Sequence, residues 1–278
     1  MARELVEEFA AYAAGLLGRR LRGIIVYGSA ARPQDFSPLS DVNVAVIGEG
    51  VGRRERLSLA VALGSRLFPI VMSLEELRRL MRTGHMLAHA LARDSWIVMC
   101  DEEVERELAA EPPVNEETLQ CLWRRSIACL SAAVRCYYQG LPESTTYAYR
   151  AVKSAAMYEG VRRGEGLKFS DAEVLELLAD KPSPRRVLRG LVEARREGRG
   201  TSMSELDEAV AAVADLLRVA PAPWSEAAEE ARKAGIRVLE GVRLNCAEGR
   251  MMWEVWGVDE SGRRLTVRNC PPPTPHHT

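Results

Sequence analysis

Short β-branched runs alternate with amphipathic stretches along the first hundred residues of the chain. Apolar residues recur every three or four positions between residues 3 and 20, and a β-branched run follows at Ile24-Ile25-Val26. The first pattern is typical of a helix and the second of a buried strand. By the same reasoning we expect further strands over residues 42–46, 69–72 and 96–99, and helices over 53–67, after Ser73 and over 86–93. This alternation predicts a sheet domain with helices over residues 1–110.

The pattern changes after Pro112-Pro113, which we expect to act as a linker. Residues 115–220 keep helical spacing throughout and predict a helical bundle. Residues 224–270 contain three strand-like segments, the last two joined by a turn at 260–262, and predict a small antiparallel β-meander. The proline-rich end, residues 271–278, is expected to be a disordered tail. The chain is therefore predicted to be a multidomain α+β protein.

The composition narrows the class of protein. The net charge of −1 gives no reason to expect attraction to nucleic acid or to a membrane surface, and no apolar run approaches the ~20 residues that span a bilayer. The N-terminus lacks the long apolar core of a secretory signal, so we expect a cytoplasmic protein with no membrane partner. Lys supplies only four of the 38 basic residues, and Asn and Gln are scarce. This bias fits either a heat-adapted source or a GC-rich genome.

The cysteines and histidines do not predict a metal site. None of the six cysteines forms a CxxC pair, which makes a zinc site unexpected. His85 and His89 have the spacing of a metal-binding pair on a helix, but no third ligand lies near them in the sequence. We therefore expect these two histidines to lie on a helix surface or to pack.

The stretch "VYGSAARPQDFSPLSDVNVAVIG" carries the strongest chemical signal of the chain. Gly28-Ser29 directly follows a predicted buried strand, where a flexible backbone and a hydroxyl can approach a phosphate. Asp41 opens the next strand, and residues 41 and 43 point to the same side of it. A carboxylate at that place can hold Mg²⁺ against a triphosphate, and Arg32 can neutralise phosphate charge.

The segments "GSAAR" at 28–32 and "SDVNVAV" at 40–46 resemble the nucleotidyltransferases of the DNA polymerase β superfamily, especially the minimal nucleotidyltransferases. The resemblance implies a mixed sheet with helices, ATP or another nucleoside triphosphate as substrate, and Mg²⁺ as cofactor. It implies an acceptor that is a small molecule, a protein or RNA, and it leaves open whether the chain forms a homo-oligomer. It assigns catalysis to Asp41 and Asn43, the metal to Asp41, and nucleotide binding to Gly28, Ser29, Arg32 and Ser40. The alternative to nucleotide binding for Ser40 is a hydrogen bond that only stabilises the turn.

The sequence departs from the family pattern at two places. Asn43 stands where a second aspartate is expected, and the third acid is missing from Ile70-Val71-Met72. Glu76 follows closely but reads as a capping box with Ser73. Loss of one preorganised charge-stabilising group can lower a rate by ~10²–10³. The expected activity is therefore weakened, and the alternative is a catalytically inactive module that binds a nucleotide or a partner.

Residues 126–178 resemble the HEPN helical domain that often accompanies such nucleotidyltransferases. HEPN ribonuclease activity is excluded, because no histidine occurs between His89 and His276 to complete an Arg-x₄₋₆-His motif. Arg150 and Lys153 share a predicted helix face and could reach a phosphate, but we favour a solvated face. The basic run 185–199 is likewise expected to be a solvated amphipathic helix. At least one of Trp253 and Trp256 is expected to pack in a core.

Overall fold

A computed structural model describes residues 2–62, 64 and 67–269, so the expected tail at 271–278 lies outside the described residues. The chain divides into two compact units, Met1–Cys121 and Leu122–Thr278. The division falls inside one long helix, α6 (Glu116–Tyr138). Within the described residues, no helix combines the length and the apolar character needed to cross a bilayer.

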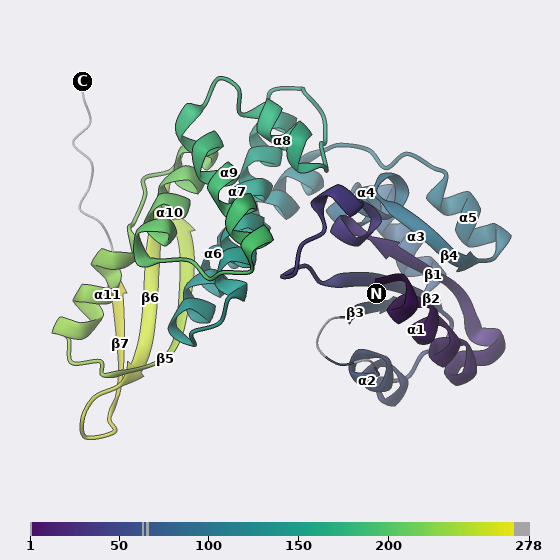
Figure 1. Ribbon diagram of the computed structural model, residues 1–278, viewed down its shortest axis with the longest axis horizontal. Coiled ribbons are helices and arrows are strands. Elements are labelled where there is room, and N and C mark those ends of the chain that lie inside the picture. The colour runs from purple at the N-terminus through teal and green to yellow at the C-terminus, as the bar shows by residue number, and fades with distance from the viewer. Residues whose placement is uncertain (1, 63, 65–66, 270–278) are drawn as a thin grey trace. The chain divides into compact units, whose positions relative to one another are not determined.

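The first unit is built on a mixed four-stranded sheet (Figure 1). Its strands are β1 (Leu21–Tyr27), β2 (Val42–Gly48), β3 (Leu67–Met72) and β4 (Ser95–Cys100), in the order β3-β2-β1-β4. β1 pairs antiparallel with β2 and β4, whereas β3 pairs parallel with β2. The predicted mixed sheet is therefore confirmed. Pro69 is tolerated because β3 is an edge strand, where a missing N–H donor is acceptable.

The alternation of side chains along β1 and β2 creates two cores on opposite faces of the sheet. Ile24, Val26, Val44 and Val46 pack with buried residues of α1 (Ala2–Leu17) and α2 (Arg53–Val61). Ile25, Ala45 and Ile47 pack with α3 (Leu74–Thr83), α4 (Met86–Arg93) and α5 (Glu102–Leu108). Successive strand residues point to opposite faces, so the one run of apolar residues serves both layers.

Local signals place the helix ends of this unit. Ser73 Oγ accepts a hydrogen bond from the Glu76 N–H at 3.1 Å, and Glu76 Oε2 accepts one from the Ser73 N–H at 2.7 Å. The predicted capping box before α3 is thus confirmed. The helix expected over 53–67 is too long, because α2 ends at Val61 and β3 begins at Leu67. Gly64 between them has a φ of +75°, a left-handed conformation that does not continue a helix.

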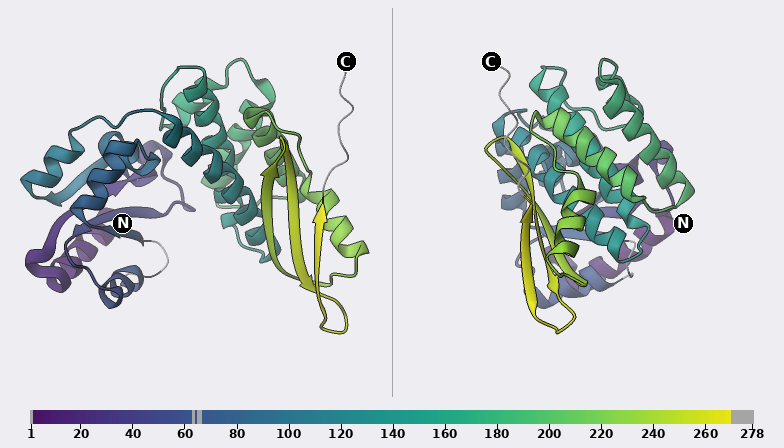
Figure 2. Two further views of the ribbon diagram at one scale, coloured as in Figure 1. Left: turned by 180° about the vertical axis from the view of Figure 1, so that it is seen from behind. Right: turned by 90° about the vertical axis from the view of Figure 1, so that its left-hand side faces the viewer.

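The second unit holds a helical bundle and a separate antiparallel sheet. The helices that follow α6 are α7 (Glu143–Arg162), α8 (Asp171–Leu177), α9 (Pro182–Glu197), α10 (Met203–Leu217) and α11 (Trp224–Lys233). The sheet contains β5 (Val238–Ala247), β6 (Arg250–Val258) and β7 (Arg264–Asn269), in that order. The predicted β-meander is confirmed, and Figure 2 shows α11 against the strands β6 and β7.

Tryptophans join this sheet to the helix α11. The indole of Trp253 is fully buried, its Nε1 donates to the Ala222 carbonyl at 2.8 Å, and its ring lies 5.0 Å from that of Trp224. Trp256 covers Gly241 so closely that a Cβ there would come within 2.3 Å of the indole. The expected packing role is therefore confirmed for Trp253.

Candidate functional site

The end of strand β1 forms a tight corner, which we call the β1 corner. We define it as Gly28–Arg32 together with Asn43 of β2 and with Asp41, which directly precedes β2. A short 3-10 turn, η2 (Gly28–Ala31), begins directly after Tyr27. Gly28 has a φ of +78°, in the region that favours glycine, and its N–H donates to the carbonyl of Asp94 at 3.0 Å. The corner is thus pinned to the residue that precedes β4.

The register of the sheet brings Asn43 to this corner. Tyr27 is the Cα partner of Asn43 on β2 and of Ser95 on β4. A Cβ built on Gly28 would lie 3.8 Å from Asn43 Nδ2, which is ordinary contact. Asn43 shares a strand face with Ala45 and therefore points to the layer of α3, α4 and α5. Asp41 is half-buried and directly precedes β2.

The described part of β3 supplies no carboxylate to this site. The partners of Val42, Asn43 and Val44 on β3 are Leu67, Phe68 and Pro69. The glutamates that follow β3 are used elsewhere. Glu76 caps α3, as described above, and the exposed Glu75 lies 3.1 Å from Arg82. Two aspartates that were not singled out from the sequence lie beside Arg32.

Those two aspartates, Asp35 and Asp94, hold Arg32. Arg32 Nε donates to Asp35 Oδ2 at 2.6 Å, and its Nη1 forms an ion pair with Asp94. The carboxylate side chains are only 3% and 7% exposed. Burial by itself would lower the pKa of Arg32, but hydrogen bonds to Asp94 and Asp35 outweigh it and raise the pKa. We call these three residues the Arg32 cluster.

The Arg32 cluster changes what Arg32 can do for a phosphate. A phosphate group has to compete with two buried carboxylates for the guanidinium. Asp94 lies two residues before the predicted strand 96–99, which was its one signal in the sequence. Its place beside Arg32 follows from the strand register, because the pairing of β4 with β1 places the beginning of β4 beside the end of β1.

Ser40 takes part in a local turn. Its Oγ accepts a hydrogen bond from the Ser37 N–H at 2.9 Å and lies 3.0 Å from Ser37 Oγ. The side chain is buried. This is the arrangement of the turn-stabilising alternative, and a contact of Ser40 with nucleotide stays a prediction.

The oxygen donors of the β1 corner would suit one Mg²⁺ ion better than two. Mg²⁺ is usually held by one or two carboxylates together with substrate phosphates. Asp41 offers a carboxylate and Asn43 an amide oxygen, whereas Asp35 and Asp94 contact Arg32. The set fits a single ion that arrives with a triphosphate and does not fit a pair of ions held by protein carboxylates.

The second unit contains its own buried group of charges, the Lys153 cluster, which consists of Tyr149, Lys153, Asp171 and Arg195. Lys153 Nζ donates to Asp171 Oδ1 at 2.6 Å and to the Tyr149 hydroxyl at 2.8 Å, and that hydroxyl also bonds Asp171. The Arg195 guanidinium carbon lies 4.1 Å from the centre of the Tyr149 ring. The expectation of a solvated face is therefore wrong for Lys153 and for Arg195, because both are buried.

The histidines 85 and 89 play different roles. His89 is fully buried, and its Nε2 lies 3.4 Å from Thr118 Oγ1, so its packing role is confirmed. His85 is half-buried and caps α4, its Nδ1 accepting the Leu87 N–H at 3.1 Å.

By sequence, no family model and no curated protein matches the chain. Among solved structures it is similar to the spectinomycin adenyltransferase AAD(9) from Enterococcus faecialis, with 10% identity and a TM-score of 0.57 over 77% of this chain and 97% of that one. A toxin-antitoxin with AMP-PNP has 18% identity and a TM-score of 0.28, over 37% of this chain and 80% of its own. A nucleotidyltransferase-like protein from Exiguobacterium sibiricum 255-15 has 12% identity and a TM-score of 0.27, over 98% and 100%.

The last two alignments have TM-scores too low to carry an argument, and the first one shows the fold. Its coverage of 77% exceeds the share of the chain that lies in Met1–Cys121, so the likeness is not confined to the mixed sheet. The fold of this chain is that of a nucleotidyltransferase.

Proposed function

We propose that this protein binds a nucleoside triphosphate at the β1 corner and transfers its nucleotidyl group to an acceptor. The observation that carries the proposal is the left-handed Gly28 at the end of a buried strand, with Asn43 of β2 beside it and Asp41 directly before β2. The nucleotidyltransferase fold supports it, and AAD(9), which shares that fold, was solved with ATP and spectinomycin.

Each residue of the corner has a proposed part. The turn at Gly28-Ser29 lies against the phosphates, since a glycine permits close approach of the backbone. Asp41, helped by the amide oxygen of Asn43, holds Mg²⁺, which neutralises phosphate charge and acts as a Lewis acid when it is bound. Arg32 contributes its charge through the Arg32 cluster, and Ser40 keeps the turn before Asp41 in shape.

We expect slow transfer. Nucleotidyl transfer depends on positioning and on charge stabilisation, and the corner has one carboxylate and one amide where a full site has three acids. The acceptor is a small molecule, a protein or RNA, and ATP is the first nucleotide to test. Spectinomycin is the first small acceptor to test, because it accompanies ATP in the AAD(9) structure.

The experiment compares the unchanged protein with Asp41→Ala and with Asn43→Asp, using labelled nucleotides, Mg²⁺ and a panel of acceptors. Asp41→Ala should lower the transfer rate by at least ~10²-fold, and Asn43→Asp should raise it by a similar factor. Glu75→Ala is the control, since this exposed glutamate pairs with Arg82 on the surface of α3. Transfer that Asp41→Ala leaves unchanged would refute the assignment.

A second candidate is a nucleotide-binding or partner-binding module without turnover. The apolar partners of Asn43 and its neighbours on β3, together with the engagement of Asp35 and Asp94 by Arg32, favour it. Isothermal titration distinguishes the two candidates. A module of this kind binds nucleotide with little dependence on Mg²⁺ and shows no transfer even after Asn43→Asp.

A further inference from the structure

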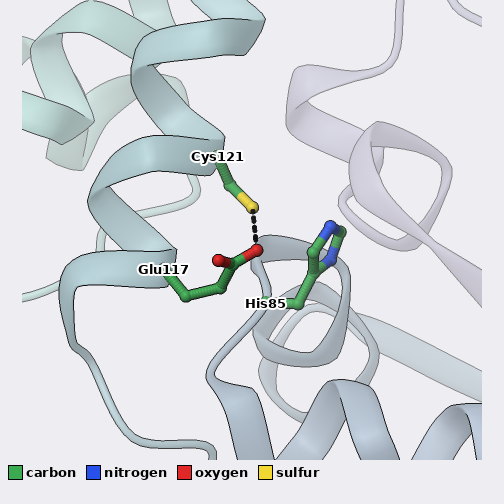
Figure 3. Close-up of side chains that lie close together, drawn as sticks. All are labelled: His85, Glu117 and Cys121. Atoms are coloured by element: carbon green, nitrogen blue, oxygen red, sulfur yellow. Dashed lines mark hydrogen bonds between the residues drawn. The ribbon is translucent and has the colours of Figure 1, made fainter.

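Three side chains of different chemistry meet near the beginning of α6. His85 comes from the turn between α3 and α4, and Glu117 and Cys121 come from the first turns of α6 (Figure 3). One ligand atom from each residue lies within 4.8 Å of the other two. All three side chains are half-buried, so they are reachable from solvent but partly shielded from it.

The spacing of residues on α6 explains why Glu117 and Cys121 lie next to each other. Glu117 and Cys121 are four residues apart and therefore lie on the same face of the helix, one turn above the other. The Cys121 thiol donates to Glu117 Oε1 across 3.5 Å. This pair presents a sulfur and a carboxylate side by side toward the turn that carries His85, as Figure 3 shows.

His85 lies near this pair because hydrogen bonds hold the α3–α4 turn against the beginning of α6. Asn115 Nδ2 donates to the Thr83 carbonyl at 3.1 Å, and Thr118 Oγ1 donates to the Gly84 carbonyl at 2.7 Å. A Cβ at Gly84 would come within 2.0 Å of the Pro113 carbonyl oxygen, so only glycine permits this approach. The backbone, rather than three flexible side chains, therefore sets the distance between His85 and α6.

We propose that His85, Glu117 and Cys121 form a binding site for one Zn²⁺ ion, with a water molecule in the fourth position. A sulfur, an imidazole nitrogen and a carboxylate oxygen are the three ligand types that zinc takes in proteins. The hard ions Mg²⁺ and Ca²⁺ prefer sets made of oxygen alone, which separates this site from the β1 corner. The bound ion links α6 to the α3–α4 turn. It adds to the hydrogen bonds that Asn115 and Thr118 donate to the backbone of that turn.

Zinc binding requires two changes at the site. The Cys121 thiol gives up its proton to the solvent as its sulfur bonds the ion, because the thiolate is the ligand form. His85 Nδ1 now accepts the Leu87 N–H, so a neutral ring carries its proton on Nε2. The ring therefore exchanges this one capping hydrogen bond for the bond to zinc. Binding should consequently perturb the Leu87 amide.

The test uses the full chain, freed of metal with a chelator under reducing conditions, and titrates it with Zn²⁺ against a coloured competitor. We expect one Zn²⁺ per chain. Cys121→Ser and His85→Asn should each weaken binding by about 100-fold or more, since even supporting residues of metal sites contribute 10–100-fold. Asparagine is a good N-cap residue, so His85→Asn removes the imidazole and keeps a capping group for α4.

Two controls separate this site from other ligands in the chain. Cys100→Ser changes a half-buried cysteine of the same unit that lies outside the cluster, and it should leave the affinity unchanged. A double variant, His276→Ala with His277→Ala, removes the adjacent histidines near the C-terminus and should also bind as the parent does. Binding that vanishes with the double variant and persists in Cys121→Ser would overturn the proposal.

Cobalt gives a readout that does not depend on a variant. Co²⁺ in place of Zn²⁺ should show a thiolate-to-metal charge-transfer band in the parent protein, and circular dichroism verifies that each variant is folded. A parent protein that binds no Zn²⁺, or that binds Co²⁺ without a thiolate band, contradicts the site.

Discussion

Each unit contains a buried cluster of charged side chains, and the two clusters differ in their balance of acidic and basic groups. In the Arg32 cluster two carboxylates share one guanidinium, which leaves one net negative charge among the three residues. In the Lys153 cluster a single carboxylate faces a lysine and a tyrosine hydroxyl, and an arginine is stacked on the tyrosine ring. The first group has an excess of acid and the second an excess of base.

The positions of the clusters give this difference its meaning. The Arg32 cluster shares Arg32 with the β1 corner, where its excess acid would repel a phosphate until a cation neutralised it. The Lys153 cluster lies among buried residues of α7, α8 and α9, where it joins three helices. Changes in the first cluster should therefore alter nucleotide binding, and changes in the second should alter stability.

The largest expected effect is a loss of protein stability when the Lys153 cluster is changed. Asp171→Asn removes the carboxylate that Lys153 contacts at 2.6 Å and leaves a buried ammonium. Removing one partner of a buried pair typically lowers the free energy of unfolding by about 3–5 kcal/mol. Urea denaturation of the full chain measures this. Glu176→Gln is the matched control, because it makes the same chemical change at an exposed position of α8. Equal stability of the two variants would show that the cluster does not hold the helices together.

Low pH should remove the stabilising contribution of the same cluster without a mutation. Burial alone would raise the pKa of Asp171, but the charge of Lys153 and the hydrogen bonds from Lys153 and Tyr149 outweigh it and lower the pKa below 3.8. A carboxyl whose pKa is depressed on folding stabilises the protein fully above its unfolded pKa, and this contribution is lost as the pH falls through the folded one. Unfolding free energies measured from pH 6 down to about pH 2 should thus fall more steeply in the parent than in Asp171→Asn. Parallel curves would rule out this carboxyl as the source.

The smallest effect, on affinity, concerns the Arg32 cluster. Asp94→Asn removes one of the two acids that hold Arg32 and should raise nucleotide affinity about tenfold, which corresponds to ~1.4 kcal/mol. Isothermal titration with ATP, with and without Mg²⁺, measures the change. The gain should be larger without Mg²⁺, because the ion screens the excess acid of the corner. A fall in affinity would mean that Asp94 helps to bind the nucleotide or its metal.

Structural features with a local cause could be predicted from the sequence. The strand Ile24-Ile25-Val26 and the capping box of Ser73 and Glu76 follow from neighbours a few residues apart. The turn at Gly28-Ser29 was likewise predictable, because a glycine after a β-branched run marks the end of a strand. The length of α2 was misjudged, since its apolar spacing continues past Val61 and Gly64 interrupts it only through its backbone conformation.

Contacts between residues far apart in the sequence could not be predicted from it. Lys153 and Arg195 were expected on solvated faces because each is a charged residue in an amphipathic helix. Burial needs a partner that the pattern of one helix does not contain, here Asp171 and the ring of Tyr149. The missing third ligand beside His85 is a similar case, since Glu117 and Cys121 come from a different helix.

The sequence by itself determined where strands and helices form and where the chain turns, because periodicity, caps and glycines act over a few residues. The tertiary structure alone decided which charges far apart in the sequence meet. Arg32 meets Asp94 only because β4 pairs with β1, and His85 meets Cys121 only because Gly84 lets two backbones approach. Such meetings depend on the order of strands and on the packing of helices, which no short stretch of sequence specifies.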